Sequence, residues 1–401
     1  MASMSTTEVE ELVYKLEQLA AEDLPPSILN DNVLRRKLRE ATQSLNTAVQ
    51  WPSDSVHLIA YGALYSSMAR VGVDTKTFEV LGGSTKPMSS EEVAEKTGVD
   101  PVLMKRFLRF YQSFRWIKET SENQFTANNV TKALSPPGGT GIKYYNTVLN
   151  PAFTALPEYF KSHGYKNPTN PLDSPWQLGY NTSEHPFVWL QSHPEHFQLF
   201  MSWLPMEREG LPQWLDMFPF EEHVARETKD ETVIFVDIGS ALGSQSIALR
   251  EKYPQLKGRV IIQDQQHVID AWTPNARPGI DAMVYNFFTP QPVKGARAYY
   301  MRNIMHDHQD GQCHEILHNI MAAMSHDSVL LIDDIVLREV GAPWRSTMAD
   351  MNLLSALAAK ERSQKEWYAL LESAGLKILS IWEYAAETGD SIIVAKPKEF
   401  V

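Results

Sequence analysis

Apolar side chains recur at helical spacing through the N-terminal region. The pattern predicts helices over residues 7–22, 31–50 and 52–72, with Pro25 and Pro26 separating the first two. The positions that set this spacing in the first two helices are Val9, Leu12, Leu16, Leu19, Val33, Leu34 and Leu38. Such a stripe packs against another helix, in the same chain or in a partner chain. Because the three apolar faces are too extensive for so short a region to bury alone, we expect a homodimer formed by these helices.

Two further helices joined by a turn are predicted for the stretch MSSEEVAEKTGVDPVLMKRFLRFYQSFRWIKE. Ser89 or Ser90 can cap the first helix, and Glu92 is placed for a capping box. Gly98 ends this helix and Pro101 opens the next. The arrangement is a helix-turn-helix pattern.

A β-wing is expected after these helices, at residues 116–119 and 124–127. The pattern fits either DNA binding or a winged-helix-like structural module. The second helix carries Lys105, Arg106 and Arg109, but aromatic and aliphatic side chains interleave with them. The formal net charge is -12, whereas a protein that neutralises phosphates is basic over its binding face. The structural interpretation is favoured, and nucleic acid is not expected as a partner.

Aromatic residues and prolines dominate the middle of the chain. Helix signals recur at 151–162, 184–203 and 205–217. Most of the aromatic side chains here are expected in the core, and some could line an apolar pocket for a flat aromatic or polyketide-like ligand. They include Tyr144, Tyr145, Phe153, Tyr159, Phe160, Trp176, Phe187, Trp189, Phe197, Phe200, Trp203, Trp214 and Phe218.

From residue 232 onward, strand-like runs alternate with helical ones. TVIFVDIG, GRVIIQD, ARAYYMRN, SVLLIDDIVL, KILSIWEY and SIIVAKP are the strand candidates. This alternation is typical of a doubly wound α/β fold with a mostly parallel sheet and helices on both faces. Three regions follow from the whole pattern: a helical domain at 1–135, a helical connector that contributes to a substrate pocket at 136–225, and an α/β domain at 226–401.

A possible cofactor loop follows the first of these strands. The strand ends at Asp237, and a turn containing Gly239 and Gly243 leads into a helix. The next strand ends at Asp264, where a carboxylate can bind ribose hydroxyls. The spacing G-x-x-x-G differs from a dinucleotide fingerprint, and a buried acid at Asp237 suits a cationic ligand end. The plain alternative is an ordinary turn capped by Ser240.

Several classes of protein are excluded by composition. Cys313 is the single cysteine, so an intramolecular disulfide is impossible and a thiolate zinc site is not expected. The N-terminus lacks the basic and apolar segments of a signal peptide, and no apolar run approaches the roughly 20 residues of a membrane helix. A cytoplasmic protein without membrane contact is expected.

From about residue 30 to the end, the chain resembles the caffeate and hydroxyindole-type O-methyltransferases in their fungal secondary-metabolism branch. The resemblance implies an N-terminal winged-helix-like dimerisation domain, a Rossmann-like class I methyltransferase domain and S-adenosylmethionine as the cofactor. It assigns cofactor contacts to Asp237, Gly239, Ser240, Gly243, Asp264, Gln265, Asn286, Phe287 and Arg302. The family usually has Asp where Asn286 stands.

The resemblance also covers the catalytic segment MRNIMHDHQD, with its pair His306 and Asp307. It implies that His306 is the general base, and that Asp334 and Glu361 orient its ring. A neutral imidazole is a competent base near neutral pH, and a carboxylate on its other nitrogen fixes the tautomer. Two departures stand out: His308 replaces the usual aromatic residue, and an Asp replaces the first orienting Glu. Asp333 beside that Asp leaves the register open by one residue.

A metal site is the alternative for the stretch HDHQDGQCH, which superficially resembles the ligand motif of metallo-hydrolases. The final His of that motif is replaced by Gly311, and no second cluster of ligands is evident. No metal is therefore expected.

The predicted function is methyl transfer to a hydroxyl of a hydrophobic aromatic or polyketide-type secondary metabolite. The strongest alternative keeps the fold. The resembling family includes fungal pericyclases that use S-adenosylmethionine as a bound cation for dehydration and cycloaddition or ene chemistry, without consuming it. An inactive cofactor-binding module is a third possibility, but the candidate catalytic residues argue against it.

Overall fold

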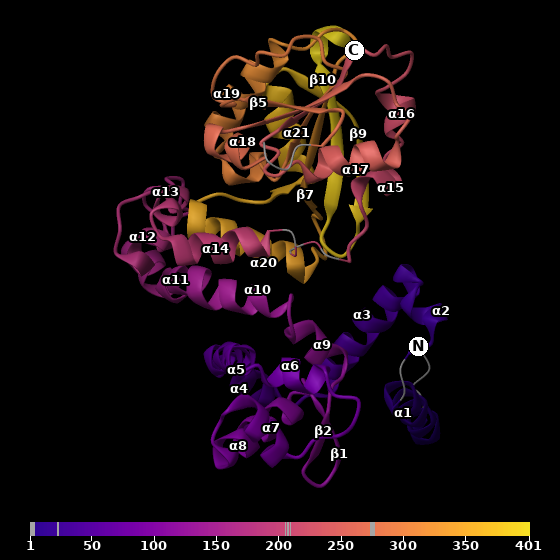
Figure 1. The fold of residues 1–401 in the computed structure, drawn as a ribbon, viewed down its shortest axis with the longest axis vertical. Coiled ribbons are helices and arrows are strands. Elements are labelled where there is room, and N and C mark those ends of the chain that lie inside the picture. Colours follow the sequence, from indigo (N-terminus) through magenta and orange to yellow (C-terminus); the bar gives the residue numbers. More distant parts are fainter. Residues whose placement is uncertain (1–4, 22–23, 205, 207, 209, 273–276) are drawn as a thin grey trace. The chain divides into compact units, whose positions relative to one another are not determined.

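The computed structural model describes residues 5–21, 24–204, 206, 208, 210–272 and 277–401. The chain divides into two compact units, Met1–Ser66 and Ser67–Val401, and the division falls inside helix α5 (Figure 1). No helix in the described residues has the length and apolarity needed to cross a membrane.

The secondary structure of the first unit, in its described residues, consists of helices. It contains α1 (Thr6–Ala21), α2 (Pro26–Leu29), α3 (Asn32–Val49), α4 (Pro52–Ala60) and the start of α5 (Gly62–Asp74). Asp31 caps α3 by accepting from the backbone of Val33 and Leu34. The single helix expected over 52–72 is wrong, because Tyr61 leaves the helical region at φ -89° and ψ 9° and ends α4 before Gly62.

The second unit begins with a small module built on α6 (Thr77–Gly82), α7 (Ser90–Thr97), α8 (Pro101–Ser113), the hairpin β1 (Lys118–Ser121) and β2 (Gln124–Thr126), and α9 (Asn129–Leu134). Ser89 and Glu92 form a capping box, and Gly98 ends α7 at φ 71°. The first wing strand starts two residues later than expected, because its pairing with β2 begins at Lys118; Trp116 and Ile117 before it are buried in the core of the module.

The connector consists of α10 (Gly139–Tyr144), the π-helix η1 (Tyr145–Leu149), α11 (Asn150–Ser162), α12 (Pro175–Tyr180), α13 (Pro186–Gln191), α14 (Pro194–Trp203), α15 (Trp214–Met217) and α16 (Phe220–His223). The expected helix 184–203 is two helices, because His193 precedes a proline and is non-helical. Of the residues described in the expected helix 205–217, those of Trp214–Met217 are helical and the others are not. Residues 205, 207 and 209 lie outside the described part.

The α/β domain contains the strands β3 (Val233–Ile238), β4 (Arg259–Asp264), β5 (Ile280–Val284), β6 (Ala298–Arg302), β7 (Val329–Leu337), β8 (Arg362–Ser363), β9 (Leu376–Ala385) and β10 (Asp390–Pro397). The sheet order is β5-β4-β3-β6-β7-β10-β9, with β8 beside β7. Strands β3 to β8 pair in parallel, and β10 runs antiparallel to both β7 and β9. The expected α/β fold is confirmed.

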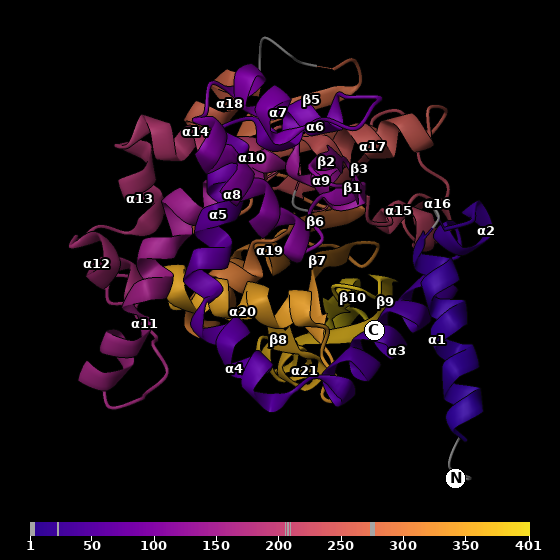
Figure 2. The ribbon, with the colours of Figure 1, turned by 90° about the horizontal axis from the view of Figure 1, so that it is seen from below.

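Helices α17 (Ser244–Lys252), α18 (Gln266–Trp272), α19 (Asp310–Met321) and α21 (Gln364–Ser373) cover the two faces of this sheet. The domain also contains η3 (Met305–Asp307), α20 (Trp344–Leu357) and η4 (Lys398–Phe400). One core lies on the α19 and α21 side, and a second on the side of α15, α17 and α18. Helix α20 also packs against α11 and α12 of the connector (Figures 1 and 2).

Candidate functional site

The turn after β3 requires glycine for two different reasons. Gly239 and Gly243 both have positive φ, at 70° and 68°. A Cβ on Gly239 would lie 2.5 Å from a side-chain carbon of Ile304, and one on Gly243 would lie 3.1 Å from the Trp272 ring. Ala241, between them, also has positive φ, at 48°. The glycines therefore let the backbone turn tightly and pack closely against Ile304 and Trp272.

Two acids lie beside this turn, at the carboxyl ends of β3 and β4. Asp237 accepts from Ser246 Oγ at 2.8 Å, and burial raises the pKa of Asp237 to about 7. Asp264 accepts from the backbone N–H of Ala241 at 2.8 Å and of Gln265 at 2.7 Å, while its burial raises its pKa. Ligands of such sheets bind beyond the carboxyl ends of the strands, so both acids lie where the loop predicts a ligand.

The remaining predicted cofactor residues lie at the same edge of the sheet. Asn286 follows β5 and accepts from the backbone of Phe288 at 3.1 Å. The Phe287 ring lies 5.6 Å from that of His308. Ser240 Oγ is buried and has no hydrogen-bond partner among the described residues. Arg302 lies with its Nε 3.6 Å from Asp333, so much of its charge is neutralised inside the sheet.

His306 lies in η3, directly after β6, among three carboxylates. Its Nδ1 is 3.0 Å from Glu361 Oε1 and 3.8 Å from Asp334 Oδ1, and its Nε2 is 3.5 Å from Asp307. Successive residues of β7 point to opposite faces of the sheet. Asp333 therefore points away and binds Tyr300 and Tyr384, and Asp334 is the acid that lies near His306.

Charge dominates the chemistry of this cluster. Burial disfavours a charged ring, but the carboxylates of Glu361, Asp307 and Asp334 outweigh it and raise the pKa of His306 to about 10. Burial raises the pKa of Asp334 to about 7, against the lowering effect of His306. Burial, together with His306, lowers the pKa of His308 to about 4. The cluster therefore holds one strongly basic imidazole beside a neutral one.

The other residues of the metal-like stretch HDHQDGQCH do not converge on His306. His314 bonds to Ser373 at 2.9 Å, and Asp310 accepts from Arg362 at 2.7 Å. No group of three or more His, Cys, Asp or Glu residues in the described part of the chain has a metal-binding arrangement.

Two residues near His306 were not predicted from the sequence. Asp350 accepts from the backbone N–H of Glu361 at 2.9 Å, and Arg362 donates to the backbone around His306. For Arg362, its place directly after Glu361 was the one signal in the sequence. Asp350 lies near Glu361 only in the folded chain. Their spacing does not resemble any catalytic motif, so only the folded structure shows their contacts.

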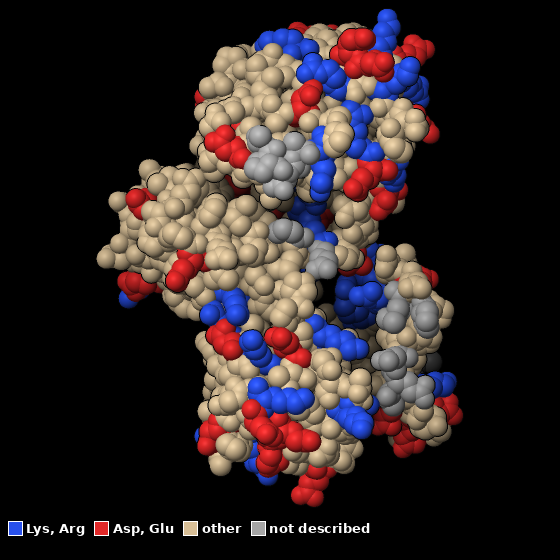
Figure 3. All heavy atoms as spheres, viewed as in Figure 1, with Lys and Arg blue, Asp and Glu red and all other residues tan. Residues whose placement is uncertain are grey.

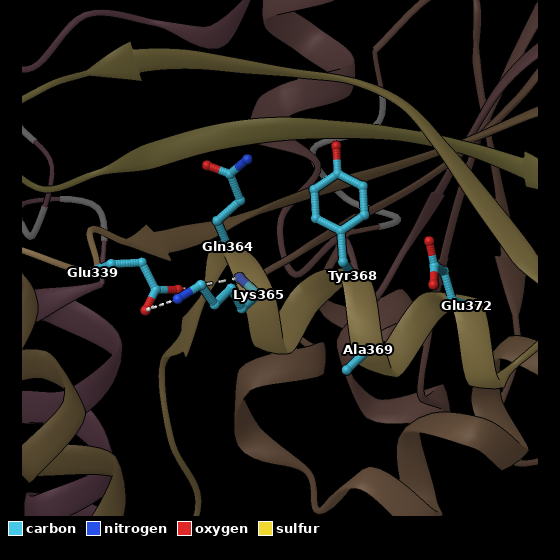
Figure 4. Close-up of a pocket in the computed structure, with 6 residues that line it drawn as sticks. All are labelled: Glu339, Gln364, Lys365, Tyr368, Ala369 and Glu372. Atoms are coloured by element: carbon cyan, nitrogen blue, oxygen red, sulfur yellow. Dashed lines mark hydrogen bonds and ion pairs between the residues drawn. The ribbon is translucent and has the colours of Figure 1, made fainter.

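A surface hollow lies elsewhere, on the outer side of α21 (Figure 4). An exposed ion pair of 3.6 Å between Lys365 and Glu339 lies at one end. The hollow shares no residue with the cluster around His306. Its lining consists of Glu339, Gln364, Lys365, Tyr368, Ala369 and Glu372.

Comparison with known proteins places this geometry in a family. The O-methyltransferase domain family matches residues 226–377. The O-methyltransferase okaF of Penicillium ochrochloron is 36% identical over 372 residues, which are 92% of this chain and 96% of that relative. This chain belongs to the O-methyltransferase family.

Two solved structures resemble this O-methyltransferase family member over nearly its whole length. The complex of LepI with SAM has a TM-score of 0.88 and 33% identity, and the match covers 98% of this chain and 100% of LepI. A structure described as a pericyclic reaction enzyme has a TM-score of 0.87, also at 33% identity. The predicted family is confirmed, and the chain is an enzyme of this S-adenosylmethionine-dependent family.

Proposed function

We propose that this protein transfers a methyl group from S-adenosylmethionine to a hydroxyl of a hydrophobic aromatic or polyketide-type secondary metabolite, with His306 as the general base. The observation that carries the proposal is the 3.0 Å contact of His306 Nδ1 with Glu361, with Nε2 left on the opposite side of the ring. This arrangement fixes the ring so that Nε2 can take a proton from a substrate.

The residues of the glycine turn fit the proposed cofactor. Gly239 and Gly243 give the turn its positive φ angles and its close packing on Ile304 and Trp272, and the hydroxyl of Ser240 is buried without a hydrogen-bond partner among the described residues. When bound, S-adenosylmethionine supplies an electrophilic methyl group on a sulfonium. The full set proposed to hold it is Asp237, Gly239, Ser240, Gly243, Asp264, Gln265, Asn286, Phe287 and Arg302.

His306 would accept the hydroxyl proton at Nε2 while Glu361 accepts the hydrogen bond from Nδ1. The acid cluster makes the ring a stronger base than free imidazole, because its conjugate acid is stabilised by Glu361, Asp307 and Asp334. The same effect means that the ring must first lose a proton before it can take one. Asp334 accepts no hydrogen bond among the described residues, and its Oδ1 lies 3.8 Å from His306 Nδ1; we propose that it stabilises the imidazolium that forms.

A pericyclase is the second candidate. The likeness to LepI and to the structure described as a pericyclic reaction enzyme favours it, as does the raised pKa of His306, because an imidazolium can donate a hydrogen bond to a substrate carbonyl. In this reaction the chain would release product without consuming the cofactor.

Cofactor stoichiometry separates the two candidates. The purified protein is incubated with candidate phenols and polyketides, and both the product mass and S-adenosylhomocysteine are measured. Methyl transfer requires one S-adenosylhomocysteine and one added methyl group per product. Product that forms without cofactor consumption would contradict our proposal and support the pericyclase.

The variant Asp264→Ala should weaken cofactor binding in calorimetry by about tenfold or more, because it removes a charged hydrogen-bond acceptor.

We also propose a homodimer formed through the N-terminal helices. Among the side chains described between residues 5 and 66 none is buried, and Trp51 and Ile59 are 76% and 82% exposed. Exposed apolar surface of this extent marks an interaction site. We retain the region 1–135 as the dimerisation domain, 136–225 as the connector that contributes to the substrate pocket, and 226–401 as the cofactor domain.

Light scattering with a matched pair of variants tests the dimer. Ile59→Glu should produce monomers, because it places a charge in the proposed interface. Val340→Glu, at a residue that is 89% exposed on a loop of the second unit, should leave the dimer intact. A wild-type monomer at micromolar concentration would refute the proposal.

A further inference from the structure

Arg362 is an almost completely buried cation directly after Glu361. Its guanidinium donates to the backbone oxygens of Met305 and His308, at 2.9 Å each. It also donates to Asp310 Oδ1, at 2.7 Å from Nη2 and 3.2 Å from Nε. The side chain is 1% exposed, with its guanidinium carbon 5.5 Å from the centre of the Trp367 ring.

These contacts surround the turn that carries the proposed base. Met305 and His308 are the residues on either side of the pair His306 and Asp307, so one guanidinium holds both flanking carbonyls. Asp310 begins α19, which continues the chain from this turn. Arg362 therefore ties the turn to the helix that follows it.

The backbone of Arg362 is itself fixed. It lies in β8, where it pairs in parallel with Val336 of β7, two residues beyond Asp334. Glu361, one residue earlier, contacts His306 Nδ1 at 3.0 Å, and its own N–H is held by Asp350. One dipeptide thus contacts both the ring of His306 and the backbone that carries it.

Arginine is suited to this position by its shape. Its planar fork directs several N–H groups at once to different acceptors, whereas the ammonium of a lysine is a single point charge on a flexible stem. A lysine could replace the charge beside Asp310, but it could not hold the carbonyls of Met305 and His308 together. The number of held carbonyls, and not the charge, is what a lysine would change.

We propose that Arg362 is a positioning residue that sets the contact between His306 and Glu361, and so determines the basicity and orientation of the catalytic ring. The proposal rests on the proposed role of His306. Among the described residues, the guanidinium of Arg362 donates to Met305, His308, Asp310 and Cys313, none of which belongs to the glycine turn, so cofactor binding should not depend on it.

The variant Arg362→Lys tests this proposal, with Arg338→Lys as the matched control. Arg338 also donates to a carboxylate, Glu383, and to a backbone oxygen, that of Ala386, but it is an exposed residue at the end of β7. We expect Arg362→Lys to lower kcat by about ten- to a hundredfold, as expected for a displaced general base, with cofactor Kd unchanged. Arg338→Lys should change neither quantity.

A direct titration of His306 keeps the test independent of turnover. Histidine ring signals are followed by NMR in protein labelled on histidine, and the His306 signal is assigned by its loss in His306→Ala. The groups that face this ring are Asp307, Asp334, Glu361 and His308. In Arg362→Lys the pKa of His306 should fall toward that of a free histidine, because the ring moves away from Glu361.

An unchanged titration of His306 in a folded Arg362→Lys variant would overturn the proposal, even if kcat falls. Equal losses of kcat and cofactor affinity would also overturn it, because they indicate general damage to the fold. If the wild type does not transfer methyl groups, the proposed function fails, but a shifted His306 titration in Arg362→Lys still supports the positioning role.

Discussion

Asp333 and Asp334 are neighbours on β7, and both are completely buried, yet their surroundings differ in every respect. Asp333 accepts hydrogen bonds from Tyr300 at 2.5 Å and Tyr384 at 2.7 Å, and lies beside the Arg302 guanidinium. On the other face, neither oxygen of Asp334 has a hydrogen-bond partner among the described residues.

The difference places a fully hydrogen-bonded acid on one face of the strand and the acid that we propose to act on His306 on the other. A buried carboxylate is tolerated when donors and a cation surround it, and Asp333 meets this condition on the side of the aromatic core. Asp334 does not meet it, and its pKa is raised to about 7 mainly by burial. An acid in this condition costs stability, and we propose that its charge acts on His306, whose Nδ1 lies 3.8 Å away.

The largest expected effect comes from removing the ring of His306, which lies near Asp334. His306→Ala should lower turnover by roughly two to four orders of magnitude, the usual contribution of a general base, with cofactor affinity nearly unchanged. Steady-state kinetics and calorimetry measure the two quantities. His326→Ala is the control, because that ring is 80% exposed. Wild-type turnover in His306→Ala would contradict the proposed role of His306 as general base and the role of Asp334 beside it.

The second effect concerns stability on the opposite face. Asp333→Asn should lower the free energy of unfolding by roughly 3 kcal/mol, because Arg302 loses its buried counter-charge and the two tyrosines lose a charged acceptor. Denaturant titration measures the change. A loss no greater than that in Asp334→Asn would show that the two acids are equivalent.

A smaller effect is expected at Asp334 itself. Asp334→Asn should lower kcat by about tenfold, because the imidazolium of His306 loses one of its stabilising charges. Unlike Asp333→Asn, it should leave the denaturation midpoint nearly unchanged, since no hydrogen bond to Asp334 is lost within the described residues. A large loss of stability would contradict this assignment.

As the pH rises, kcat/KM should increase while the contribution of His306 to stability should decrease. A base must be unprotonated, so kcat/KM should rise with pH toward the His306 pKa of about 10. The folded-state pKa lies above that of an unfolded histidine. The stabilisation is therefore complete below about pH 6.5 and is lost as the pH rises through about 10.

Glu361→Gln sharpens this test, because it removes the nearest charge and should move the rise in activity to lower pH. The pH profile of kcat/KM and the melting temperature at each pH measure the two trends. A bell-shaped profile with its maximum below pH 7 would contradict the assignment of His306 as the base.

Regular hydrophobic patterns allowed much of the fold to be predicted. The strands that contain long apolar runs, such as β3, β4 and β7, were expected close to their observed positions. Strand β5 was missed, because it is an edge strand with exposed residues on both faces and carries the polar Asp281. The helix expected over 52–72 was split by one residue, a local backbone choice that apolar spacing does not reveal.

The sequence by itself determined which residues could form the site, because Asp237, Gly239, Gly243, Asp264 and His306 all follow or end a strand of a parallel sheet. The tertiary structure decided which of the two acids of β7 lies near His306. A strand alternates sides at every residue, so a register uncertain by one exchanges the faces completely. The contacts of the folded chain resolve that choice, because Asp334 lies 3.8 Å from His306 Nδ1 while Asp333 accepts from Tyr300 and Tyr384 on the other face.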